Sequence, residues 1–388
     1  MASVPAGIPD MRFETDISLI NSLLPAIVQA EDGLARLDER AARASIGGGF
    51  SERRHYFDAV GALWVAGELV HVEDLVLHDA HMDTRSPSHE LTIAHAVLRA
   101  RRRIWLGDPA WALSSAGLGV LAGIGGEGEG DAISGKAAIS LGEDEGGDAV
   151  DDALAAELAE IDAVLERSQR LLDSHANKVA ADASASAEPV KEKRRDDPLG
   201  LFDDEEWDEA ARLRQWRKVL ATADGLPPVL GAALMFEAWE KIEPLRRQHW
   251  LGGVLVASYL RARGKVTSHL FSFYTGLKTI RHERRRARDR LTRLQSFLEA
   301  MSESAVLGLK EMDRLSLAQT QMELRFRDRR SNSSLPQLAE LILSRPMVST
   351  SMVARELRVT NRGALNLLND IGVREMTGRG RYRAWGII

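Results

Sequence analysis

The chain has 388 residues, of which 44% are hydrophobic, 28% are charged and 5% are aromatic, and its formal net charge is -6. This length allows more than one domain, and the scarcity of aromatic and β-rich runs favours helices. The absence of cysteine excludes disulfides, thiolate catalysis and zinc–thiolate fingers. The most apolar run, residues 112–126, is too short and glycine-rich to span a bilayer, and no secretory leader is predicted, so we expect a cytoplasmic protein without membrane contact.

The N-terminal part shows apolar residues at helical spacing, interrupted by breakers. Helices are predicted over residues 15–44, 52–82 and 89–105. The glycine-rich, acidic stretch 117–147 buries too little apolar surface to become ordered and predicts a flexible loop. Helical periodicity returns over 150–175. These patterns predict an N-terminal helical region over residues 1–178, followed by a linker rich in Ala, Ser and Lys over residues 179–198.

A second helical body is predicted over residues 199–330. Its helices are expected near 204–223, 229–241 and 244–263, followed by a long basic helical segment from Arg281. Residues 278–293 carry eight Lys or Arg side chains and two acidic ones. This basic run can grip phosphates, or it can be an exposed helix face paired with acidic segments of the same protein, and the sequence leaves both interpretations open.

The last unit, residues 331–388, has a net charge of +4, from eight Arg and four acidic residues. A helix over residues 335–344 is stopped by Arg345-Pro346. Ser349 or Thr350 offers an N-cap hydroxyl to the next helix, and Thr360 caps a third one. The remaining residues, 373–388, predict a strand, a basic turn and a strand.

The third of these helices has a polar outer face. Its apolar residues, Ala364, Leu367, Leu368 and Ile371, recur at the spacing i, i+3, i+4, i+7 and are expected in the core. The run V-S-T-S-M-V-A-R-E-L-R-V-T-N-R-G-A-L-N-L-L-N-D-I-G, followed by T-G-R-G-R-Y-R, resembles the winged helix-turn-helix family of bacterial regulators. The resemblance implies double-stranded DNA as partner, with the third helix in the major groove. The expected DNA-binding residues are Thr360, Asn361, Arg362, Asn366, Arg379, Arg381 and Arg383.

A second resemblance lies in the body. Residues 242–259, I-E-P-L-R-R-Q-H-W-L-G-G-V-L-V-A-S-Y, are similar in spacing and hydrophobic pattern to the Fic fold, whose enzymes carry H-P-F-x-D/E-G-N-G-R-x-G-R and transfer the AMP of ATP to a protein hydroxyl. Pro244 and Gly253 match that motif. Glu243, however, replaces the catalytic histidine, Arg247 replaces the metal-binding acid, and Gln248 and His249 stand where glycine and asparagine cradle phosphate. The resemblance therefore implies a degenerate, catalytically dead Fic-like body.

These observations together predict a mainly α protein with a multi-helical Fic-like body and a C-terminal winged helix-turn-helix that has a small β-hairpin. The layout resembles an uncharacterised, often plasmid-associated bacterial family. We expect a DNA-binding transcriptional regulator or plasmid-associated factor, not an enzyme, with no catalytic residue and no cofactor. A homodimer, and a protein partner bound through the Fic-like body, are further expectations.

Two alternatives to this function remain open. The body can be an active AMP transferase with a displaced base such as His249, or the chain can be an antitoxin-like protein-binding scaffold whose winged unit contacts only protein. A dense group of His and acidic residues at positions 71–83 raises the question of a metal, but a solvated polar helix face is the preferred interpretation. No metal site is therefore expected.

Overall fold

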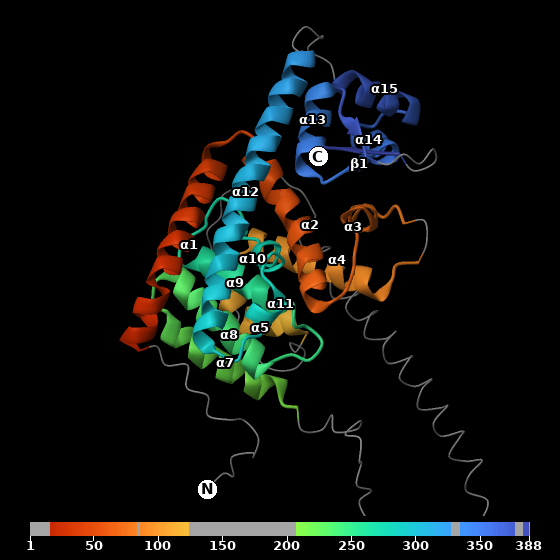
Figure 1. The fold of residues 1–388 in the computed structure, drawn as a ribbon. Helices are drawn as coiled ribbons and strands as arrows, with labels where there is room; N and C mark the ends of the chain where they lie inside the picture. Colours follow the sequence, from red (N-terminus) through yellow and green to blue (C-terminus); the bar gives the residue numbers. More distant parts are fainter. Residues whose placement is uncertain (1–15, 84–85, 124–206, 327–333, 377–382, 388) are drawn as a thin grey trace, which may run out of the picture. The chain divides into compact units, whose positions relative to one another are not determined.

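The computed structural model describes residues 16–83, 86–123, 207–326, 334–376 and 383–387. These residues are mainly helical, with one small antiparallel sheet near the C-terminus (Figure 1), which confirms the predicted fold class. The helices are α1 (Ile17–Arg43), α2 (Gly47–Ala66), α3 (Val72–Asp79), α4 (His89–Leu106), the 3-10 helix η1 (Trp111–Leu113), α5 (Ser115–Ala122), α7 (Glu209–Ala223), α8 (Pro228–Ile242), α9 (Leu251–Ala262), α10 (Phe273–Leu277), α11 (His282–Arg285), α12 (Arg290–Phe326), α13 (Leu335–Ser344), α14 (Thr350–Glu356) and α15 (Asn361–Ile371). The strands are β1 (Val348–Ser349), β2 (Arg374–Glu375) and β3 (Ala384–Gly386).

Helices α1 and α12 form a long parallel pair, visible side by side in Figure 1. The carboxylate of Asp16 caps α1 by accepting a hydrogen bond of 2.7 Å from the Leu19 backbone N–H. Small residues let the two backbones approach each other. A Cβ added at Gly33 would lie 3.3 Å from the Cβ of Ala305, and one at Gly308 would lie 2.6 Å from the Leu37 side chain. These contacts fix the lateral position of α12.

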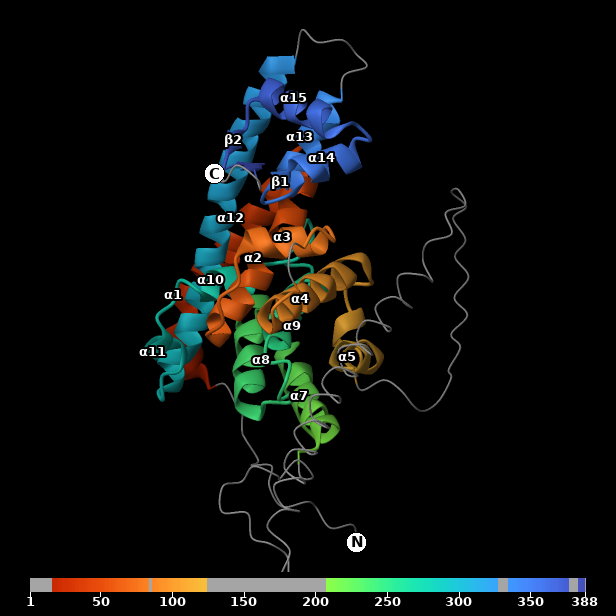
Figure 2. The same ribbon diagram turned by 90° about the vertical axis from the view of Figure 1, so that its right-hand side faces the viewer.

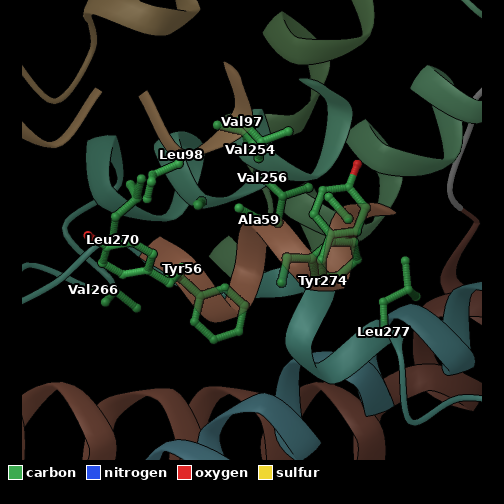
Figure 3. Close-up of a cluster of buried hydrophobic side chains, with 14 of the residues drawn as sticks. Tyr56, Ala59, Val97, Leu98, Val254, Val256, Val266, Leu270, Tyr274 and Leu277 are labelled. Atoms are coloured by element: carbon green, nitrogen blue, oxygen red, sulfur yellow. The ribbon is translucent and has the colours of Figure 1, made fainter. Parts of the chain in front are cut away.

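The centre of the body is formed by helices that are apolar on all sides. Helix α9 is buried from Leu251 to Leu260, and α8 is buried over most of its length. A helix without a polar face belongs in the interior. Figure 3 shows side chains of α2, α4, α9 and α10 meeting in one cluster, among them Ala59, Val97 and Val254. Helices from both sides of residues 124–206 therefore share one core.

Several helix boundaries differ from those predicted. The predicted helix 52–82 is two helices, because Gly67 ends α2 in the left-handed conformation with φ 95°. The predicted helix 244–263 begins only at Leu251, since Glu243 ends α8 with φ 47° and a loop follows. The basic segment from Arg281 is not one helix, because α11 has four residues and α12 starts at Arg290.

The predicted flexible loop begins later than residue 117, because α5 continues to Ala122. Gly117 is required there, since a Cβ would lie 2.0 Å from the Trp111 carbonyl oxygen. The rest of that loop, the periodic stretch 150–175 and the linker 179–198 lie outside the described residues.

The C-terminal unit has the winged-helix order of elements, with α13, β1, α14 and α15 followed by the hairpin β2–β3. The strand order is β1-β3-β2, antiparallel throughout, with Trp385 opposite Val348 on one side and Glu375 on the other. Figure 2 shows α13, α14 and α15 grouped around β1. Trp385 is 3% exposed, so its ring lies in the core of this unit. The hairpin was predicted, whereas β1 was not.

The winged unit packs on α2 and α12. The guanidinium of Arg53 donates one hydrogen bond to the Arg345 carbonyl oxygen and another, of 2.8 Å, to Glu311 of α12. At the far end of α12, Arg325 donates a bond of 3.0 Å to the carbonyl oxygen of Ile371, the last residue of α15. Charged side chains, buried at Arg53 and Glu311 and exposed at Arg325, thus join the C-terminal unit to the body.

Candidate nucleic-acid interface

Two hydroxyl caps define the helix-turn-helix. Ser349 accepts a hydrogen bond of 3.2 Å from the Met352 N–H at the start of α14, and Thr360 accepts one of 3.1 Å from the Gly363 N–H at the start of α15. Each cap satisfies a backbone donor that has no partner within its helix. Between the helices, Arg358 takes the left-handed conformation with φ 53°. Both predicted caps therefore lie where the sequence placed them.

Helix α15 separates its apolar and polar side chains. Ala364, Leu368 and Ile371 are buried, while Leu367 is half-buried against the same core. Three of the predicted DNA-binding residues, Asn361, Arg362 and Asn366, are exposed on this helix, and Thr360 is exposed at its N-cap. Amide and guanidinium groups on one helix face can hydrogen-bond the edges of adenine and guanine.

Two cations near α15 were not among the predicted site residues. Arg355 on α14 and Arg358 in the turn are both exposed and lie just before the cap of α15. Together with Arg362 they form no ion pair within the described part of the chain. The signal was present in the sequence as R-E-L-R, but only the structure shows that both side chains are exposed.

Of the three wing arginines expected to bind DNA, one, Arg383, is among the described residues, and it already has an acidic partner. Arg383 donates a hydrogen bond of 2.9 Å from Nε to the carboxylate of Glu375 on the opposite strand, and its guanidinium lies 5.1 Å from the Trp385 ring centroid. The hydrogen bond from Arg383 lowers the pKa of Glu375. The pair offsets one of the wing charges expected to meet phosphate. Arg379 and Arg381 lie outside the described residues.

The six residues of the predicted degenerate Fic motif occupy the end of α8, the following loop and the start of α9. Glu243, Arg247 and His249 are exposed, whereas Pro244 and Gly253 are buried. The side-chain oxygen of Gln248 is buried and has no hydrogen-bond partner.

The backbone of this loop is fixed by two aromatic side chains. Trp239 donates a hydrogen bond of 3.1 Å to the His249 carbonyl oxygen, and the Tyr274 hydroxyl donates one of 2.7 Å to that of Trp250. The same hydroxyl accepts a bond of 3.1 Å from the Gly253 N–H. Gly253 lies directly under Tyr274, because an added Cβ would be 2.4 Å from the ring. Packing alone therefore requires the glycine that matches the Fic motif.

The histidine-rich stretch at 71–83 forms local polar contacts. His78 lies 2.7 Å from the Asp83 carboxylate, and its ring packs edge-on against His95 at 4.7 Å. Among the described residues, no group of three or more His, Asp or Glu side chains is arranged to hold a metal ion. The described helices also include none that is both long enough and apolar enough to cross a membrane.

Comparison with known families agrees with the class that this geometry defines. Residues 335–388 match the family model described as "HTH DNA binding domain", so the C-terminal unit is a helix-turn-helix DNA-binding domain. Residues 201–327 match a second model, described as "Protein of unknown function (DUF1612)".

One relative aligns over almost the whole chain. It is the uncharacterized protein y4cF of Sinorhizobium fredii (strain NBRC 101917 / NGR234), 44% identical over 377 residues, with 95% of this chain and 97% of the relative covered. The chain belongs to the same family as this protein.

Proposed function

We propose that the protein is a sequence-specific DNA-binding regulator, transcriptional or plasmid-associated, in which α15 is the reader helix. The observation that carries this proposal is the exposed face of α15, where Asn361, Arg362 and Asn366 project from a helix whose opposite face is locked into the core of a helix-turn-helix domain. Recognition helices of such domains contact base edges with residues near their N-termini. All three side chains lie in the first two turns.

Two cations near the proposed reader helix are suited to contact phosphates and not bases. Arg355 and Arg358 are exposed and come shortly before α15 in the chain. They are suited to contact phosphates, which positions a protein on the duplex without reading sequence. A single winged unit contacts few base pairs, so we further propose that two copies of the chain bind two half-sites.

The experiment that tests this function is a selection of bound duplexes from a random DNA library with the full-length protein, followed by titration of the enriched sequence. An enriched motif that is bound more tightly than scrambled DNA supports the proposal, and an inverted repeat of that motif supports the dimer. If a folded protein enriches no sequence, the reader assignment is wrong, and the winged unit is better explained as a protein-contact module.

We also propose that the body is not an enzyme and that its Fic-like loop is catalytically silent. Glu243, at the position of the catalytic histidine, is exposed at the end of α8, and the carbonyl oxygens that follow are bound by Trp239 and Tyr274. A solvent-exposed carboxylate is a weak base for a hydroxyl proton at neutral pH. Incubation with labelled ATP, Mg²⁺ and candidate proteins should transfer no label. Transfer by the wild type that disappears in Glu243→Ala or His249→Ala would show that the body is an active transferase.

A further inference from the structure

A basic surface lies on the body, in the segment between α10 and the start of α12. It consists of four exposed side chains, Lys278, Arg281, Arg286 and Arg288, and we call these four residues the basic surface. The short helix α11 within this segment packs against α12. The surface is therefore attached to the body and is separate from the helix-turn-helix.

Other charges of the same segment are neutralised inside the protein. Arg284 pairs with Glu299 of α12 at 2.6 Å, and Arg290 and Arg293 both pair with the buried carboxylate of Glu237. Asp289 is used as a cap, because it accepts a hydrogen bond of 2.8 Å from the Thr292 N–H. By contrast, no residue of the basic surface forms an ion pair within the described ranges, although the charge of Arg286 acts on the half-buried carboxylate of Glu240. The charges of Lys278, Arg281 and Arg288 remain available to a partner outside the chain.

An aromatic side chain anchors one edge of the surface. The ammonium of Lys278 lies 5.4 Å from the ring centroid of Trp64, and the guanidinium of Arg285 lies 5.8 Å from it. Trp64 is 39% exposed, so these cations are held at the boundary with solvent and are not buried. Cation–π contacts restrict the motion of such side chains and lower the entropy lost when they bind an anion.

The distance from the reader helix decides what kind of DNA can meet this surface. Arg284 is bound near the start of α12, at Glu299, whereas Ile371 of the reader helix is bound at Arg325 near its end. This stretch of α12 is about 40 Å long at a helical rise of about 1.5 Å per residue. One turn of B-DNA is roughly 34–36 Å long, so a duplex no longer than one reader site ends before it reaches the basic surface.

We propose that the basic surface binds DNA backbone phosphates outside the site that α15 reads. This inference rests on the proposed function, because a reader that holds a duplex raises the effective concentration of neighbouring phosphates at the body. Lys and Arg contacts to phosphate add affinity for any sequence and strengthen the salt dependence of binding. The surface therefore extends the footprint without changing the sequence preference.

The test compares two triple variants of the full-length protein that lose the same charge. Arg281→Ala/Arg286→Ala/Arg288→Ala removes the arginines of the basic surface. The control is Arg36→Ala/Arg43→Ala/Arg214→Ala, which removes exposed arginines whose partners are Asp32, Glu39 and Asp208. Each variant is titrated at several salt concentrations with the selected site at the centre of a duplex of about 16 base pairs, which extends roughly 27 Å to either side, and in a duplex of about 45 base pairs, which spans more than four turns.

The surface variant should lose salt dependence on the long duplex alone. At about 0.9 per phosphate contact, the slope of log K against log salt should fall by about 2.7, while the short duplex and the control variant change little. An unchanged slope on the long duplex overturns the inference, and so does an equal fall in the control. If the wild type binds the selected site as proposed and only the slope result fails, the reader assignment stands. If the wild type binds no duplex even at low salt, both proposals are wrong.

Discussion

At the scale of single residues, Arg362 is the side chain on which the proposed base recognition depends most. It is exposed on α15, one residue after the start of the helix, and forms no ion pair within the described residues. We expect Arg362→Ala to weaken binding of the selected site by ~1–3 kcal/mol, because an arginine that bonds a guanine with two donors discriminates between bases. Scrambled DNA should be bound almost as before. Fluorescence titrations of both duplexes measure the difference, and an equal loss on both would mean that α15 does not read.

The wing pair of Arg383 and Glu375 leads to the opposite kind of prediction. The guanidinium of Arg383 donates hydrogen bonds to the carboxylate of Glu375, so the variant Glu375→Gln should make that cation available to phosphate. Binding to all sequences should then become tighter, and the salt slope should rise by about one contact. Arg383→Ala serves as the matched control and should show no such rise. A salt slope that is the same in Glu375→Gln and the wild type would place Arg383 away from the DNA.

The sequence predicted which side chains of α15 are exposed but not all of the contacts around them. The caps Ser349 and Thr360 and the outward position of Asn366 follow from local spacing, which determines where a helix starts and which face is apolar. The neutralisation of Arg383 could not be predicted, because it depends on which residue of the opposite strand lies beside it. The spacing of residues along one strand does not determine the register across a hairpin whose turn type is unspecified.

At the scale of elements, the glycines of α9 and α2 have opposite roles. An added Cβ at Gly253 would lie 2.4 Å from the Tyr274 ring, whereas at Gly48, an exposed position in α2, it would meet nothing within 4 Å. Gly253→Ala should therefore destabilise the protein by ~1–3 kcal/mol or more through overpacking. Gly48→Ala should stabilise it by ~0.4–1 kcal/mol, since alanine loses less backbone entropy on folding. Urea unfolding of both variants checks the two signs, and similar destabilisation by both would contradict this account.

Element boundaries show where local patterns stop being sufficient. The helix pattern of residues 244–263 was correct for α9, but Glu243 takes a left-handed conformation that glycine usually adopts, and the first residues of the pattern form a loop. That loop is held by Trp239 and Tyr274, one from the preceding helix and one from α10. Strand β1 was not predicted, because two residues are too few to show an alternation of apolar and polar side chains. The residue that pairs with Val348 of β1, Trp385, also lies far along the chain.

At the scale of the whole molecule, Asp79 joins the C-terminal unit to the body. Its carboxylate lies 3.0 Å from the guanidinium of Arg345 and 2.6 Å from that of Arg102. Burial favours the protonated form, but hydrogen bonds from His95 and Arg102 outweigh it and lower the pKa of Asp79 from 3.8 to about 2. The folded protein thus binds this proton more weakly than the unfolded chain, so the stabilisation is present above pH 3.8 and is lost as the pH falls toward 2.

We expect Asp79→Asn to lower the free energy of unfolding by about 2 kcal/mol near neutral pH. The difference from the wild type should shrink between about pH 4 and pH 2, because the wild-type carboxylate is protonated there. Urea unfolding at several pH values measures it. The double variant Asp79→Asn/Arg345→Ala should cost less than the sum of the single changes, since both remove one contact. A loss that is independent of pH would show that Asp79 acts through packing and not through its charge.

The parallel pairing of α1 with α12 has a consequence for the time course of folding. The apolar stripe of α1, including Leu23, Ile27 and Leu34, is covered by a helix that enters the chain some 270 residues later, as the contact of Gly33 with Ala305 shows. At synthesis rates of about 5–20 residues per second, the apolar stripe of α1 is made roughly 15–50 s before α12. Closing so long a loop is slow, and a helix that exposes apolar surface meanwhile is prone to aggregate. During synthesis, α1 is therefore a segment that exposes an apolar face until α12 has been made.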